Sequence, residues 1–253
     1  MAEKTIIAWT DKTFNALWGC TKVSDGCKNC YAATLSARYG HDVWGPKKPR
    51  RTFGQKHWLE PAKWNAEAQA DGQRLRVFCG SMFDWAEDHP TNNATRPKLW
   101  ETIRANRALD WQLLTKRPEN IARMLPPDWS AEAYPHVWLG TSIEDMRVAK
   151  RADHLRQVPA RVRFISYEPA LGPLDSLNLA GIHWVIQGGE SGPGYRPMPI
   201  EWPRAMRAAC ERAGVAYFFK QSASYRTEMG IELDGEIVRN YPPQELPRHL
   251  VAP

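Results

Sequence analysis

From residue 74 onward, short apolar segments alternate with longer segments that mix apolar and polar residues. Short apolar runs predict buried strands, and the amphipathic segments between them predict helices. Strands that alternate with helices are typical of a parallel sheet covered by helices. The predicted strands are 74–79, 111–114, 137–139, 163–165, 183–186 and 216–219, and the predicted helices are 96–107, 118–125, 144–156 and 201–213.

The residues before this repeat add one strand, at 5–9, and two helices, at 30–39 and 61–70. Seven parallel strands predict an α/β fold, a partial or complete TIM-like (βα) barrel. We expect this barrel to span 1–221, with a cysteine loop at 20–30 after the first strand and a basic loop at 41–58. The tail at 222–253 is expected to pack on the barrel.

Three of the five cysteines lie close together, at Cys20, Cys27 and Cys30. Six residues separate the first two, two residues separate the last two, and no fourth cysteine is nearby. The turn signal Asp25-Gly26 brings Cys27 back toward Cys20. Three thiolates without a fourth predict a metal or cluster site that keeps one coordination position open.

The sequence predicts a protein of the cytoplasm. No stretch of roughly 18 apolar residues could span a membrane, and the N-terminus lacks the long apolar region of a signal peptide. Clustered cysteines in that compartment are expected to bind metal rather than form disulfides. Cys79 and Cys210 are expected to be buried and structural.

Polar residues follow every predicted strand. In βα barrels the active site lies at the carboxyl ends of the strands, so these residues are expected to share one edge. Charged side chains so close to buried strands are costly unless they pair with one another or with a ligand. The residues are Gly80, Ser81, Asp84, Lys116, Arg117, Ser142, Glu144, Glu168, Gly188, Gly189, Glu190 and Lys220.

Some of these groups also have purely structural explanations. Gly188 and Gly189 could form a tight turn, or their backbone N–H groups could hold a carboxylate or phosphate. Glu144 could lie in the first turn of a helix and still bind a ligand. Lys220 could form a salt bridge with Glu190.

The basic loop could be a solvated segment or an arm that contacts phosphates. Its cations are Lys47, Lys48, Arg50, Arg51 and Lys56. The aromatic residues Trp44, Phe53 and Trp58 lie among these charges and could stack on bases. The net charge of +6 permits binding to a polyanion without requiring it.

Two chemistries fit the cysteine loop. A structural zinc site needs a fourth ligand, for which His41, His57 and His89 are candidates. An iron–sulfur site can hold a [4Fe–4S] cluster on three thiolates and leave one iron free for S-adenosylmethionine. Reductive cleavage of that cofactor yields a 5′-deoxyadenosyl radical, which removes a hydrogen atom from a substrate.

Several motifs carry a resemblance to a known family. They are Trp9-Thr-Asp11, Gly19 to Tyr31, Leu114 to Pro118, Ser166-Tyr-Glu-Pro169, Gly188 to Gly192 and Lys220-Gln221. The chain resembles the three-cysteine-motif proteins found largely in phages and prophages, a radical-SAM-like family distantly similar to spore photoproduct lyases. The usual radical SAM loop has three residues between its first two cysteines, and the Asp25-Gly26 turn can absorb the longer gap here.

The resemblance implies a radical SAM enzyme with a [4Fe–4S] cluster on the three cysteines of the loop. Gly80 and Ser81 would meet the methionine amino group of S-adenosylmethionine, and Lys116 or Arg117 its carboxylate. Ser142 and Glu144 would bind the ribose, and Gly188 and Gly189 would lie against the adenosyl part. The residues left to contact the substrate would be Asp84, Glu168, Glu190 and Lys220.

The implied partners are an electron donor, such as a flavodoxin or ferredoxin, and a nucleic acid or nucleotide that is repaired or modified. Two alternatives belong to other classes. One is a zinc-stapled nucleic-acid-binding protein without redox chemistry. The other is a hydrolase that uses Glu168 and Glu190 as acid and base.

Overall fold

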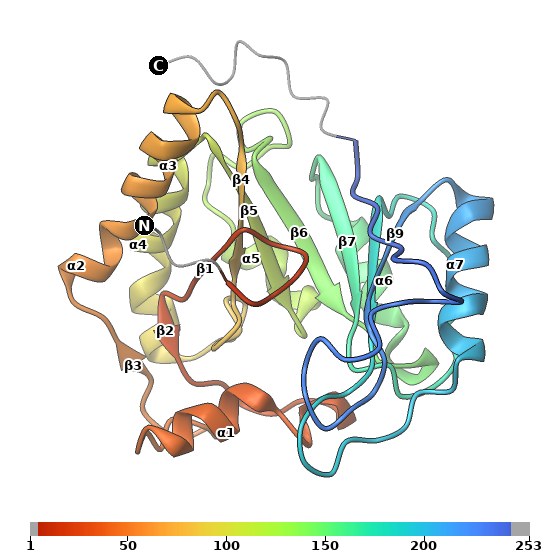
Figure 1. The fold of residues 1–253 in the computed structure, drawn as a ribbon. Helices are drawn as coiled ribbons and strands as arrows, with labels where there is room; N and C mark the ends of the chain where they lie inside the picture. Colours follow the sequence, from red (N-terminus) through yellow and green to blue (C-terminus); the bar gives the residue numbers. More distant parts are fainter. Residues whose placement is uncertain (1–4, 244–253) are drawn as a thin grey trace.

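The computed structural model describes residues 5–243 and contains a seven-stranded parallel sheet that curls into a half-barrel (Figure 1). The strand order is β1-β4-β5-β6-β7-β8-β9, and each neighbouring pair is parallel. This confirms the predicted α/β class and the partial form of the barrel. The strands are β1 (Lys12–Phe14), β4 (Leu75–Cys79), β5 (Leu109–Thr115), β6 (Val137–Ser142), β7 (Val162–Tyr167), β8 (Trp184–Gly188) and β9 (Ala216–Gln221).

Helices cover the outer face of the sheet, with α3 and α4 near one edge and α7 near the other (Figure 1). Two predicted helices, 118–125 and 144–156, are each divided into a short 3₁₀ turn and an α-helix. A two-stranded antiparallel ribbon, β2 (Leu17–Trp18) with β3 (Arg51–Thr52), flanks the sheet. The helices are α1 (Tyr31–Arg38), α2 (Gln55–Trp58), α3 (Glu60–Ala70), α4 (Pro90–Ala105), α5 (Ile121–Met124), α6 (Lys150–Arg156) and α7 (Glu201–Ala213), and the 3₁₀ turns are η1 (Asp25–Cys27), η2 (Pro118–Asn120) and η3 (Met146–Val148).

Aromatic side chains fill the concave side of the sheet. Side chains alternate between the two faces of a strand, so on β9 Phe218 points inward while Tyr217 and Phe219 pack under the helices. The inner cluster consists of Trp9, Phe78, Trp138, Val162, Phe164, Trp184, Ile186 and Phe218. These large rings fill the interior of the half-open barrel.

The predicted first strand at 5–9 is wrong, because the edge strand β1 begins later, at Lys12. The apolar run instead packs Trp9 into the inner cluster, where its ring lies 4.5 Å from that of Phe78. The next residues attach this segment to β4. Thr10 Oγ1 accepts the N–H of Phe78 at 3.1 Å, and Asp11 pairs with Arg76 at 3.0 Å.

The described part of the tail, 222–243, runs back along β9. The N–H of Phe219 donates to Val238 O at 2.8 Å, and the N–H of Asn240 donates to Tyr217 O at 3.0 Å. The ring of Tyr241 lies 5.3 Å from that of Trp184. Among residues 5–243, no helix is long and apolar enough to cross a membrane.

A buried histidine beneath the sheet should make the fold sensitive to acid. His136 is 1% exposed, its Nε2 donates to Ile103 O at 3.1 Å, and its Nδ1 has no partner in the described chain. Burial lowers the pKa of His136 to about 4. In the unfolded chain the imidazole of residue 136 has a pKa of about 6.5, so it takes up a proton at a higher pH than the folded chain does. The free energy of unfolding therefore falls as the pH drops from about 6.5 to about 4.

We expect His136 to lower the free energy of unfolding by about 3 kcal/mol between about pH 6.5 and 4. The measurement is urea unfolding at several pH values for the native chain and for His136→Gln, whose amide can still donate to the Ile103 carbonyl. The variant should lose less stability on acidification than the native chain. Parallel pH profiles for the two proteins would contradict the assignment.

Candidate active site

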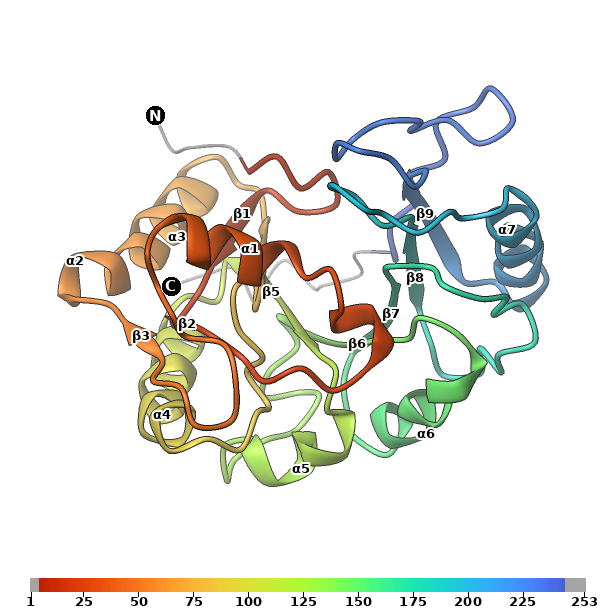
Figure 2. The same cartoon turned by 90° about the horizontal axis from the view of Figure 1, so that it is seen from below.

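The carboxyl ends of the strands gather the predicted site residues at one edge of the half-barrel. Asp84 follows β4, Lys116 and Arg117 follow β5, and Glu144 follows β6. Glu168, Glu190 and Lys220 lie at the ends of β7, β8 and β9 in the same way. The cysteine loop and α1 lie across this edge (Figures 1 and 2).

The cysteine loop is fastened to four of the strand ends. The Tyr31 hydroxyl donates to Ser81 O after β4 at 2.8 Å, and Arg117 Nη1 after β5 lies 3.6 Å from Cys20 Sγ. Two further bonds hold it to β6 and β8: Ser24 Oγ donates to Glu144 at 2.9 Å, and Asn29 Nδ2 donates to Glu190 at 2.9 Å. These contacts bring the three cysteines onto the predicted edge.

A glycine permits the closest approach of the loop to the sheet. A Cβ atom on Gly26 would lie 2.4 Å from Glu144 Oε1, so any larger residue must push the loop or the carboxylate away. We expect Gly26→Ala to lower the free energy of unfolding by about 1–3 kcal/mol. Gly54→Ala is the control, because a Cβ there meets nothing within 4 Å. Equal urea midpoints for the two variants would contradict this close packing.

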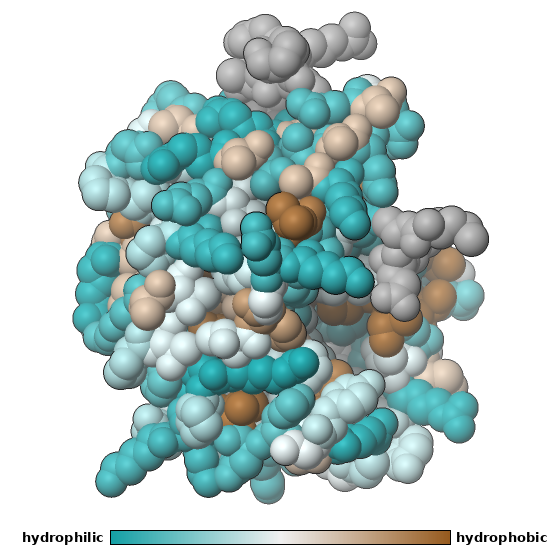
Figure 3. Space-filling view, turned by 90° about the vertical axis from the view of Figure 1, so that its left-hand side faces the viewer, coloured by the Kyte–Doolittle hydropathy of each residue, from teal (hydrophilic) through white to brown (hydrophobic). Residues whose placement is uncertain are grey.

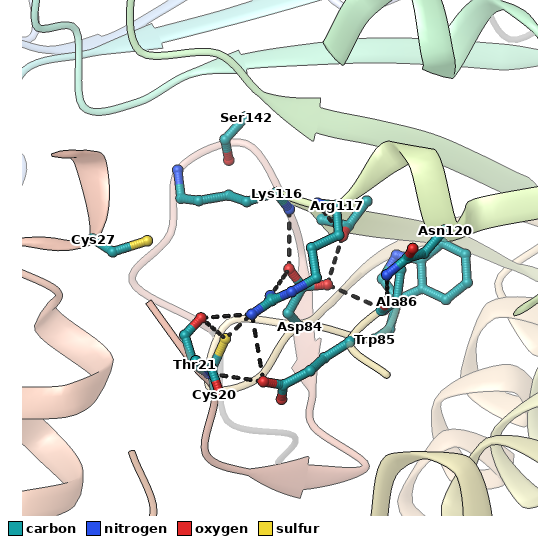
Figure 4. A network of polar contacts seen from close by, with 12 residues as sticks. Cys20, Thr21, Cys27, Asp84, Trp85, Ala86, Lys116, Arg117, Asn120 and Ser142 are labelled. Carbon is teal, nitrogen blue, oxygen red and sulfur yellow. Dashed lines mark hydrogen bonds and ion pairs between the residues drawn. The ribbon is translucent and has the colours of Figure 1, made fainter. Parts of the chain in front are cut away.

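Cys20 lies beside a buried charged network (Figure 4). Arg117 donates to Cys20 Sγ, pairs with Asp84 at 2.7 Å, and reaches Glu87 at 3.4 Å. Burial and then the Asp84 carboxylate raise the pKa of the Cys20 thiol, while Arg117 opposes them. The thiol is therefore protonated at neutral pH unless a metal centre takes its sulfur.

Cys27 and Cys30 border the start of α1. Cys27 Sγ lies 3.9 Å from Ser24 Oγ, and in Figure 4 its thiol points toward the side where Cys20 and Lys116 lie. Burial raises the pKa of the Cys30 thiol, and the backbone N–H groups at the start of α1 oppose this shift. These donors would stabilise a Cys30 thiolate.

The three thiols of the loop are the residues that could hold a metal centre. Within residues 5–243, no group of three or more His, Cys, Asp or Glu side chains is arranged to hold one metal ion. His41, His57 and His89 therefore form no such preformed group with the cysteines in the described part of the chain. A polynuclear cluster spaces its thiolate ligands more widely, and positive groups beside Cys20 and Cys30 suit its negative ligands.

Asp84 is held inside the protein, which argues against its predicted contact with substrate. Its carboxylate accepts from Thr115 Oγ1 at 2.5 Å, the Lys116 N–H at 3.1 Å, Arg117 at 2.7 Å and the Ala86 N–H at 3.1 Å (Figure 4). Arg117 is occupied in the same network. Both residues position the end of β5, and neither is free to meet a methionine carboxylate.

Glu144 forms the centre of a second network at the end of β6. This carboxylate is 1% exposed, pairs with Lys116, and accepts from Arg151 at 2.9 Å. Burial alone would raise the pKa of Glu144, but the two cations hold it below its usual value. Ser142 is also buried, and its backbone oxygen accepts from Arg151 at 2.9 Å.

Lys220 pairs with Glu168 at 3.0 Å, not with Glu190 as the sequence suggested. Glu190 instead pairs with Arg196 at 2.6 Å. Burial alone would raise the pKa of Glu190, but bonds from Arg196 and Asn29 lower it. A lowered pKa is the opposite of what a general acid needs at neutral pH, so this site does not favour the hydrolase.

The glycine-rich turn after β8 is tightly packed rather than an open cradle. The N–H of Gly189 donates to Gln221 O at 3.0 Å, and a Cβ on Gly189 would lie 2.2 Å from the backbone of Ala223. A Cβ on Gly188 would lie 2.5 Å from Glu168 Oε1. Directly after β4, Gly80 has φ +113°, and the Ser81 hydroxyl accepts from Asn15 at 2.8 Å.

The basic loop divides into inward and outward cations. Arg50 is predicted to contact phosphate, but its side chain is 0% exposed and pairs with Glu87 at 3.0 Å. That prediction is wrong, because the guanidinium also donates to the carbonyl groups that shape the loop. Trp58 is in the core as well. Lys48 pairs with Asp42, while Lys47, Arg51 and Lys56 keep exposed surface.

Glu87, Arg151, Arg196 and Asn29 are site residues that the sequence analysis missed. The first three form buried or half-buried ion pairs with predicted residues, and Asn29 bonds Glu190. Glu87 and Arg196 lie in polar loops a few residues after a strand, as the predicted residues do. Asn29 lies inside the cysteine motif itself, which was its only sequence signal.

A cavity of about 450 Å³ opens between the cysteine loop, the end of β5 and α6. Thr21 and Val23 of the loop line one side, and Lys116, Arg117 and Arg151 line another. This volume lies within the range of small-molecule sites, about 300–1,000 Å³. The cavity is therefore large enough for a small molecule and lies beside the cysteine loop.

Fold and site together define a parallel half-barrel with a three-cysteine loop over its carboxyl edge. The chain belongs to the family described as "Protein of unknown function (DUF5131)", whose model matches residues 4–242. No curated protein matches the chain. The association with phages therefore stays a prediction.

Two solved structures of spore photoproduct lyase are similar to this chain. A single mutant has a TM-score of 0.52 and 12% identity, covering 86% of this chain and 78% of that one. A double mutant with bound AdoMet and dinucleoside spore photoproduct has a TM-score of 0.48 and 13% identity, covering 85% of this chain. This chain spans 56% of that protein's length. At such low identity the likeness concerns the fold alone.

Proposed function

We propose that the protein is a radical SAM enzyme that holds a [4Fe–4S] cluster on Cys20, Cys27 and Cys30 and binds S-adenosylmethionine beside it. The observation that carries the proposal is the position of the cysteine loop. The loop lies over the carboxyl edge of a half-barrel and is bonded to the ends of β4, β5, β6 and β8. The fold likeness to spore photoproduct lyase supports it.

A bound cluster would supply the electron for reductive cleavage of S-adenosylmethionine. The protein's own groups hold the loop and receive the ligands. Arg117 and the backbone N–H groups at the start of α1 partly offset the burial that raises the pKa of the Cys20 and Cys30 thiols. Lys116 lines the cavity and pairs with Glu144, so a cofactor carboxylate would share this ammonium with Glu144. The aromatic inner cluster excludes water from the space behind the loop.

The Glu168–Lys220 pair is the best candidate to meet a substrate. Both side chains are 17% exposed, so each keeps a face toward the edge of the sheet. A paired carboxylate and ammonium can accept and donate hydrogen bonds to a polar substrate. We propose a nucleic acid or nucleotide as that substrate, with a flavodoxin or ferredoxin as the electron donor.

The proposal is tested by iron and sulfide analysis of protein purified or reconstituted without oxygen. We expect a brown protein with about four irons per chain. Its EPR spectrum after reduction should change when S-adenosylmethionine is added, because the cofactor would bind the open iron. A colourless chain with bound zinc and no iron would overturn the assignment.

A further inference from the structure

An aromatic surface lies on the flank of the molecule, where the β2–β3 ribbon meets the end of α1. The ring of Trp18 lies 6.0 Å from that of Phe53, 6.1 Å from that of Tyr39 and 5.8 Å from that of His41. Tyr39 is 63% exposed, and the other three rings are half-buried. These four residues, together with Arg51, are called the ribbon surface below.

Arg51 sits in the angle between two of these rings. Its guanidinium carbon lies 4.5 Å from the centre of Trp18 and 4.8 Å from the centre of Phe53. The rings meet at 74°, so they support the guanidinium from two sides. Within residues 5–243 it forms no ion pair and no side-chain hydrogen bond, unlike the fully paired Arg50. Its N–H donors are therefore available to a ligand.

The charges near this surface are mostly positive. Arg38, Lys47 and Lys56 are exposed, and none of them has an ion-pair partner in the described chain. Two carboxylates lie nearby, but Asp42 pairs with Lys48 and Glu60 lies 3.4 Å from His57. The available charge thus complements a polyanion.

We propose that the ribbon surface binds single-stranded nucleic acid, an inference that rests on the nucleic-acid substrate proposed above. Bases stack on flat aromatic rings and on arginine guanidinium planes, and free cations contact the phosphates between them. In a duplex the bases are already stacked on one another and do not offer these faces. The surface therefore selects single strands over duplexes.

The surface is connected to the site by one short helix. Tyr31 begins α1 and donates to Ser81 O at the edge of the sheet, while Tyr39 follows the last residue of α1 and contacts Trp18. An α-helix of this length measures about 12 Å. Figure 2 shows α1 along this edge. Figure 3 faces the flank with β3 and α2, where mostly hydrophilic residues surround smaller hydrophobic patches. A nucleic-acid strand bound at Trp18 could reach the cysteine loop within a few nucleotides.

The test is fluorescence anisotropy with a labelled oligothymidine and with a duplex of the same length, using the full chain. We expect the single strand to bind more tightly than the duplex. Arg51→Gln should weaken binding of the single strand by roughly five- to a hundredfold and reduce its salt dependence by about one phosphate contact. Arg212→Gln is the matched control, because it removes the same charge from an exposed position on α7, near the other edge of the sheet.

A second variant separates stacking from charge. Tyr39→Ser removes an exposed ring and should weaken binding without changing the salt dependence, because no cation is lost. Equal binding of strand and duplex, or equal effects of Arg51→Gln and Arg212→Gln, would overturn the proposal. Cys27→Ala should still bind the strand. The cluster and the ribbon surface can therefore fail independently.

Discussion

Replacing Cys20, Cys27 or Cys30 by Ala is expected to remove the iron from protein prepared without oxygen. Each thiolate would hold a different iron of the proposed cluster, and we expect the two remaining thiolates to be too few to retain it. The iron content should fall from about four per chain toward zero, with loss of the visible absorption. Activity that depends on S-adenosylmethionine should disappear in all three variants.

Cys210→Ala is the matched control for this series. Cys210 is fully buried in α7 and lies outside the loop, so its replacement should keep the iron. Thermal unfolding of all four variants shows whether lost iron reflects a lost ligand or a lost fold. Full iron in any of the three loop variants, with the native fold intact, would remove that cysteine from the ligand set.

Arg50→Met is expected to lower the free energy of unfolding by about 3–5 kcal/mol, because it leaves the buried Glu87 carboxylate without its main partner. Arg117 remains near Glu87, but at 3.4 Å. The change also removes donors from the carbonyl groups of Val43 and Gly45. Urea unfolding at neutral pH measures the loss.

Lys47→Met provides the comparison, since this exposed residue of the same loop should change stability by no more than about 0.5 kcal/mol. The pair also separates two explanations of the basic loop. If Arg50 contacted phosphate, its replacement would leave stability unchanged and weaken binding to nucleic acid. That result would contradict the buried position of Arg50.

The strands of the repeat were predictable because their signal is local. A strand buried on both faces must be apolar along its whole length, and the helices that cover it must be amphipathic, so both patterns appear in the sequence. Outside the repeat, the prediction fails at 5–9, where the apolar run packs into the interior of the half-barrel instead of forming a strand. An apolar residue such as Trp9 is compatible with a buried strand and with a loop packed into the interior. Only the ring contacts of Trp9 with Phe78 and Trp184 show that it belongs to the interior loop.

The candidate site was predictable in its position but not in its pairings. Parallel strands place their carboxyl ends at one edge, so Asp84, Glu144 and Glu168 were expected together. Their partners depend on which strands are neighbours and how far each loop extends. Glu190 follows β8, the neighbour of β9, yet Lys220 of β9 pairs with Glu168, which follows β7. The Glu168 side chain passes over Gly188 of β8, where a Cβ would lie 2.5 Å from its Oε1.

The sequence by itself determined the α/β class, the order of the elements and the presence of three cysteines on one loop. These features follow from burial patterns and spacings that act over a few residues. Only the tertiary structure decided that Arg50 turns inward to Glu87 while Arg51 turns outward between Trp18 and Phe53. The two neighbouring arginines differ because their orientation depends on contacts with residues that are distant in the sequence and are brought near only by the fold.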